Sequence, residues 1–104
     1  MASYIVCYDE FEGSSHFIYA GNDLDIAIGV LEWWRKLAVE AEEIRRNLPD
    51  FFTMDVEDPA YQQYSDHPAA YRDEDDRWCL MESEGIGKAF ECICGRIARS
   101  EITP

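Results

Sequence analysis

The longest periodic stretch of the sequence is DLDIAIGVLEWWRKLAVEAEEIRRN, residues 23–47. Its apolar residues recur at three- and four-residue spacing and the opposite positions are mostly charged, which is the pattern of a helix with one buried face. Asp23 can accept hydrogen bonds from the first turn, and Pro49 prevents the helix from continuing. We therefore predict one long amphipathic helix over these residues.

Two neighbouring tryptophans define the rotation of this helix. At about 100° per residue, Trp34 lies near the centre of the apolar face and Trp33 at its margin, whereas Ile28 falls on the polar side. We expect Trp34 to be nearly fully buried and Trp33 to be partly exposed.

The segments on either side of this helix resemble strands and a second helix. Residues 4–8 and 16–20 are rich in β-branched and aromatic residues and flank a polar loop, which predicts a β-hairpin. Residues 51–56 and 77–81 are shorter candidates for strands, and residues 86–99 have one apolar face. Two amphipathic helices on one face of a small, mostly antiparallel sheet would bury all these apolar stripes, so we predict a single α+β domain.

The acidic residues are unevenly distributed. The 104 residues include 22 acids and 9 bases, a net charge of −13. Residues 1–25 contain five acids and no base, and residues 50–76 contain nine acids and one arginine. This charge disfavours direct binding to DNA, RNA or an anionic membrane, which attract positive charge. The hydrophobic fraction of 47% excludes a disordered acidic tail.

Within the second acidic segment, residues 57–76 lack an apolar period and contain Pro59 and Pro68. We expect a long acidic excursion here, with one helical turn at residues 59–64. Loops of this length are uncommon in small domains and often serve a function.

The cysteines give little support for a metal site. Cys92 and Cys94 are closer in sequence than the paired ligands of zinc sites usually are. On the predicted helix 86–99 their side chains would point about 160° apart, so they could share an ion only if this segment were a strand. We therefore expect no metal, no cofactor and four free thiols. Cysteine catalysis by Cys7 with His16 lacks an orienting third group.

The concentrated acids are the main indication of function, because like charges in one place cost folding stability. Carboxylates two residues apart on an extended chain are about 6.6 Å apart, and Asp55 with Glu57, or Asp73 with Asp75, would then imitate the charge spacing of a nucleic-acid strand. Three tyrosines between these acids either contact a partner or anchor the loop to the core, and both interpretations stay open. The residues expected to face a partner are Asp9, Glu10, Glu12, Asp55, Glu57, Asp58, Tyr61, Tyr64, Tyr71, Asp73, Glu74, Asp75 and Asp76.

In its size, acidity and lack of a catalytic motif, the chain resembles the small phage-encoded inhibitors called anti-CRISPR proteins, many of which imitate nucleic-acid charge. It also resembles acidic immunity proteins that neutralise nuclease toxins. The resemblance implies a non-enzymatic inhibitor in the cytoplasm of a bacterial host, a monomer or weak homodimer. Its partner would be a basic nucleic-acid-binding protein such as a CRISPR effector or a nuclease.

Two other classes of function remain as alternatives. One is a small thiol or metal-dependent enzyme that uses Cys7, Cys92 or Cys94. The other is an assembly subunit that associates through Trp33 and Ile28. The absence of an apolar run of about 18 residues and of a basic N-terminal start argues against a membrane span or a secretory signal.

Overall fold

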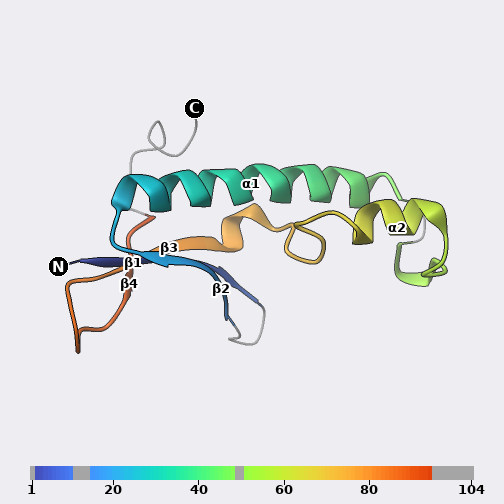
Figure 1. Ribbon diagram of the computed structural model, residues 1–104. Coiled ribbons are helices and arrows are strands. Elements are labelled where there is room, and N and C mark those ends of the chain that lie inside the picture. The colour runs from blue at the N-terminus through green and yellow to red at the C-terminus, as the bar shows by residue number, and fades with distance from the viewer. Residues whose placement is uncertain (1, 11–14, 49–50, 95–104) are drawn as a thin grey trace.

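The N-terminal hairpin and the long helix are present as predicted. The computed structural model describes residues 2–10, 15–48 and 51–94. β1 (Ser3–Asp9) and β2 (Ser15–Gly21) pair antiparallel, and α1 (Leu24–Arg46) lies across the sheet (Figure 1). The side chain of Asp23 accepts hydrogen bonds from the backbone N–H groups of Asp25 and Ile26, which confirms the predicted cap.

Two further strands complete an antiparallel sheet of four. β3 (Trp78–Ser83) pairs with β1, and the two-residue β4 (Glu91–Cys92) pairs with β3, which gives the order β2-β1-β3-β4. The N-terminal strand is therefore in the interior of the sheet. Together with α1 and a short second helix, this sheet confirms the predicted α+β class.

The long helix covers two separate hydrophobic clusters. Under its N-terminal half, the first cluster packs α1 against β1 and β3; under its C-terminal half, the second packs α1 against α2 (Pro59–Ser65) and the turn that follows (Figure 1). Trp34 contacts both clusters and stacks on Trp78, with ring centroids 5.0 Å apart. Trp78 is only 1% exposed, so this stack joins the two halves of the molecule.

The rotation of α1 agrees only in part with the expectation. Trp33 is 61% exposed, as a residue at the margin of the buried face should be. Trp34 is partly rather than fully buried. Ile28, expected on the polar side, packs against the first cluster because the sheet extends beneath this part of the helix. Of the two residues proposed for self-association, only Trp33 is therefore exposed.

The segment predicted as a strand over residues 51–56 is not one. It begins with the 3-10 turn η1 (Phe51–Thr53) and continues into the turn before α2. Phe51 packs face to face with Tyr61 and edge-on against Tyr64, so local aromatic packing takes the place of strand pairing. The helical turn predicted at 59–64 is confirmed as α2, which Asp58 caps.

The predicted second helix over residues 86–99 is wrong where the structure describes it. Gly87 has a φ of +80°, outside the range of a right-handed helix, and residues 91–92 form β4. The backbone N–H of Ile93 donates to the carbonyl of Leu80 at 2.9 Å, and Ile93 is buried in the first cluster. Residues 95–99 of this prediction lie outside the described part of the chain.

The molecule is elongated, with principal extents of 49 × 29 × 18 Å. Its long dimension follows α1, with the sheet at one end and α2 at the other (Figure 1). Among the described residues, no helix has the length and apolar character needed to cross a bilayer.

Candidate functional site

The C-terminal part of the acidic excursion is anchored against the end of the hairpin. Arg77 donates to the backbone carbonyl of Asp9 at 3.3 Å. Arg72 lies 3.2 Å from Nδ1 of His16, whose Nε2 lies 2.6 Å from a carboxylate oxygen of Glu10. An arginine can only donate, so Nδ1 of His16 accepts and its Nε2 carries the proton that Glu10 accepts. These contacts bring residues 72–77 beside residues 9–10.

The result is an acidic surface made from two segments far apart in the sequence. We call Asp9, Glu10, Glu74, Asp75 and Asp76 the acidic face; η2 (Asp75–Arg77) holds its last two members. Glu74 pairs with Arg77 and Glu10 with His16. Asp75 and Asp76 are exposed, and neither has an ion-pair partner among the described residues.

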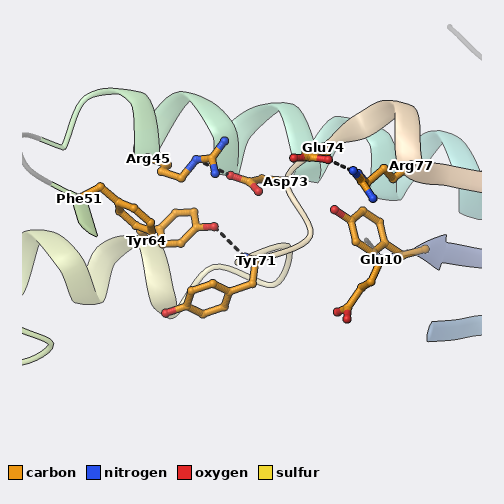
Figure 2. A pocket seen from close by; sticks show the side chains of 9 residues that line it. Glu10, Arg45, Phe51, Tyr64, Tyr71, Asp73, Glu74 and Arg77 are labelled. Carbon is orange, nitrogen blue, oxygen red and sulfur yellow. Dashed lines mark hydrogen bonds and ion pairs between the residues drawn. The ribbon is translucent and has the colours of Figure 1, made fainter. Parts of the chain in front are cut away.

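An open pocket of about 360 Å³ adjoins the acidic face (Figure 2). Aromatic residues contribute one part of its wall and charged residues the other. The complete lining is Tyr8, Glu10, Arg45, Phe51, Tyr64, Tyr71, Asp73, Glu74 and Arg77. Tyr8 on β1 and Glu74 both line the pocket, so the pocket lies between the sheet and the acidic face. The pocket combines aromatic surface with both signs of charge, which suits contact with a protein side chain.

Asp73 is the exception among the predicted surface acids, because it is only 3% exposed. Its Oδ2 lies 3.0 Å from Nε of Arg45, close enough for an ion pair but outside hydrogen-bond geometry. Burial raises the pKa of Tyr64, and a hydrogen bond to Asp73 acts in the same direction. Asp73 therefore holds the excursion to α1 and α2, and it does not present its charge to solvent.

The three predicted tyrosines have different roles. Tyr64 is 1% exposed, and its hydroxyl accepts the backbone N–H of Tyr71 at 2.7 Å, so it anchors the loop. Tyr71 is 57% exposed and has a φ of +64°, a left-handed conformation that costs a non-glycine residue about 1–2 kcal/mol. Its hydroxyl shares a hydrogen bond of 2.6 Å with Tyr61, which raises the pKa of Tyr71 to about 12. Strain of this kind needs a structural or functional reason, and here the Tyr64 contact supports it.

The acids before α2 form a separate group. Asp55, Glu57 and Asp58 are exposed and directly precede α2 in the chain. Asp55 accepts the backbone N–H of Glu57, and Asp58 accepts that of Ala60. Because residues 55–57 form a turn and Asp73 is buried, the predicted extended pairs with phosphate-like spacing are absent. Glu12, also predicted at the interface, lies outside the described residues.

Sequence reasoning missed a cluster of cysteines. The sulfur atoms of Cys79, Cys92 and Cys94, which we call the thiol cluster, all lie within 4.8 Å of one another. The expectation that Cys92 and Cys94 diverge is wrong, because it depended on the helix that β4 replaces. The signal was present in the sequence, since a glycine-containing turn between two short apolar segments is typical of a hairpin.

The four thiols differ in environment. Cys7 is fully buried, and burial raises the pKa of its thiol to about 11, with contributions from Asp9 and the nearby Cys92 and Cys94. Within the thiol cluster, a hydrogen bond from Cys79 lowers the pKa of Cys94 and raises that of Cys79. No contact joins His16 to Cys7 among the described interactions, so cysteine catalysis by this pair, already disfavoured by the sequence, gains no support.

Comparisons of the chain with protein-family models, with curated proteins and with solved structures find no match. The function has to be argued from the acidic face, the pocket and the thiol cluster themselves.

Proposed function

We propose that the protein is a non-enzymatic inhibitor that docks its acidic face on a basic, nucleic-acid-binding surface of another protein. The observation that carries the proposal is the convergence of two acidic segments, residues 9–10 and 74–76, into one exposed surface beside an aromatic pocket. Folding brings these like charges together although self-repulsion opposes it. A basic partner would offset that repulsion on binding.

The charges of the acidic face are arranged to attract a cationic surface over a distance. Asp75 and Asp76 are exposed and have no ion-pair partner among the described residues. Exposed charges of one sign raise the association rate with an oppositely charged partner and give less to the final affinity. The affinity would come from the adjoining pocket, where Tyr71 presents a large exposed ring.

The pocket suggests how specificity would arise. A lysine or arginine of the partner can enter between Glu10 and Glu74, while its aliphatic stem lies against the neighbouring rings. The two arginines that line the pocket, Arg45 and Arg77, are paired with Asp73 and Glu74, so the partner's cation would compete with Arg77 for Glu74. The second acidic group, at residues 55–58, would make a separate contact at the other end of the elongated molecule.

The test is a capture experiment with charge-reversal variants. The immobilised protein is incubated with bacterial lysate, and bound proteins are eluted with salt or with excess DNA or RNA. The variant Glu74→Lys/Asp75→Lys/Asp76→Lys reverses the charge at three positions of the acidic face and leaves Asp73 in place. The matched control, Glu43→Lys/Glu84→Lys/Glu91→Lys, makes the same change in net charge at exposed positions elsewhere.

We expect the wild type and the control variant to capture the same nucleic-acid-binding proteins. The Glu74→Lys/Asp75→Lys/Asp76→Lys variant should not capture them, and added DNA or RNA should displace them from the wild type. Association should slow as salt rises, because exposed charges are screened over about 8–10 Å at physiological ionic strength. Capture that survives the excursion reversal, or that is indifferent to salt and nucleic acid, would contradict the proposal. Both variants should give the circular dichroism spectrum of the wild type, since none of the six residues is buried.

A further inference from the structure

The thiol cluster lies at the edge of the sheet and follows from the pairing of β3 with β4. Met81 is the register partner of Cys92, and the backbone N–H of Ile93 donates to Leu80. β4 ends at Cys92, and beyond it the backbone N–H of Leu80 donates to Sγ of Cys94. The strand pairing and this contact together bring the sulfur atoms of Cys92 and Cys94 to that of Cys79.

We propose that Cys79, Cys92 and Cys94 bind a single thiophilic metal ion, Zn²⁺, through their three thiolates. Sulfur atoms bound to one tetrahedral zinc at about 2.3 Å are about 3.8 Å apart. The Sγ atoms of Cys79 and Cys92 are 2.8 Å apart, and all three sulfurs lie within 4.8 Å of one another, so these values bracket the required spacing. An S–S bond is about 2.05 Å long, so Cys79 and Cys92 are not joined by a disulfide.

Two neighbouring groups suit sulfurs that carry negative charge. The backbone N–H of Leu80 points at Sγ of Cys94 at a distance of 3.2 Å. Arg35 donates to the carbonyl of Trp78, the residue before Cys79, and its charge acts favourably on the Cys94 thiolate. The Nε atom of Arg35 is buried without a hydrogen-bond partner among the described residues. The positive charge of Arg35, which acts on Cys94, partly offsets the single negative charge that remains after one Zn²⁺ binds three thiolates.

Three protein ligands leave the fourth position of a tetrahedral zinc open to water. Cys92 is exposed, so water can reach the thiol cluster. Cys7 is the register partner of Cys79 on β1, but its sulfur is not among those within 4.8 Å of one another. Cys7 therefore serves as a matched control with the same side chain in the same part of the sheet.

The ion would also fasten β4 to the domain. β4 contains two residues, and residues 86–90 before it are exposed, with Ile86 fully so. Such a short edge strand gains little stability from its own backbone pairing. A metal bound by one cysteine of β3 and two from the segment of β4 would close this hairpin. This inference is independent of the acidic face.

The experiment uses the full chain, freed of metal with a chelator under reducing conditions and then titrated with Zn²⁺ alone. Native mass spectrometry measures the number of ions bound, and iodoacetamide labelling followed by peptide mapping measures the protection of each thiol. The variants are Cys92→Ser, at an exposed position where the fold should survive, and Cys7→Ala as the control. Loss of an outer-sphere partner alone lowers metal affinity by about 10–100-fold, so Cys92→Ser should lower it by at least about 100-fold.

We expect one Zn²⁺ per chain in the wild type and in Cys7→Ala, with Cys79, Cys92 and Cys94 protected together. Hydrogen exchange at residues 91–93 should slow when Zn²⁺ binds. Failure of the reduced wild type to bind Zn²⁺ would overturn the proposal, as would a mass lower by two hydrogens that maps to a disulfide between Cys79 and Cys92. If Cys7→Ala loses the ion while keeping its fold, the assignment of the three ligands is wrong. Protection of the three thiols in the wild type by Zn²⁺ tests the proposal without any variant, so the test remains valid if a variant misfolds.

Discussion

Replacement of Asp73 by asparagine should destabilise the fold by about 1–2 kcal/mol, although the side chains have nearly the same shape. Breaking a buried ion pair by removing one partner costs about 3–5 kcal/mol when both charges are buried. Here Asp73 is buried, but the side chain of Arg45 is 35% exposed, so solvent screens part of the charge that is left unpaired. Asparagine also keeps an oxygen that can accept from Tyr64. Both effects reduce the expected cost.

Urea unfolding followed by tryptophan fluorescence measures this cost, because the Trp34–Trp78 stack reports on both hydrophobic clusters. The matched control is Asp75→Asn, the same chemical change two residues away at an exposed position, which should alter stability by less than about 0.5 kcal/mol. For a domain of this size, the Asp73 variant should lower Tm by about 5–15 °C. Equal losses of stability in the two variants would refute the assignment of Asp73 as a buried anchor.

Three further predictions concern other contacts. Trp34→Ala should cost about 2–4 kcal/mol in urea unfolding, slightly less than a fully buried tryptophan, and Trp33→Ala should cost far less because its side chain is mostly exposed. Asp58→Ala removes the cap of α2 and should cost about 1 kcal/mol, measured in the same way. Because burial raises the pKa of Tyr64 in the fold above its ordinary value, the fold favours the neutral phenol and loses stability as the pH rises above about 10. The loss of stability between pH 9 and pH 11 should therefore be smaller in Tyr64→Phe than in the wild type, and an equal loss would contradict the assignment.

The parts of the fold with strong local patterns were predictable from sequence. The helix at 23–47 has a long apolar period with a cap at one end and a proline beyond the other, and the N-terminal hairpin has two β-rich segments around a polar loop. Residues 86–99 also fit a helical period, but Ile86 is fully exposed and Ile93 is buried. Residues 91–92 form a strand because they pair with β3, and the spacing of apolar residues gives no information about that pairing.

The candidate site was predictable only at the level of the segment. The concentration of charge in residues 50–76 indicated an acidic surface, and most of those acids are exposed. Asp73 is the buried member of the run 73–76 because it pairs with Arg45 on α1. The sequence of the run does not indicate this long-range contact. The thiol cluster likewise depends on a register between two strands. Composition therefore predicts which segments are acidic or contain cysteine, and tertiary contacts determine the role of each individual residue in them.

The order of strands in the sheet has a consequence for how the chain folds. β1 precedes β3 in the chain but needs β3 on its second edge, where Val6 is paired with Leu80. The hairpin and α1 can form early from local contacts, whereas closing β1 against β3 carries the entropy cost of a loop of about 70 residues. On the ribosome, the second edge of β1 would stay unpaired until β3 has emerged. We therefore expect docking of β3 to limit the folding rate and Trp78 fluorescence to report that final step.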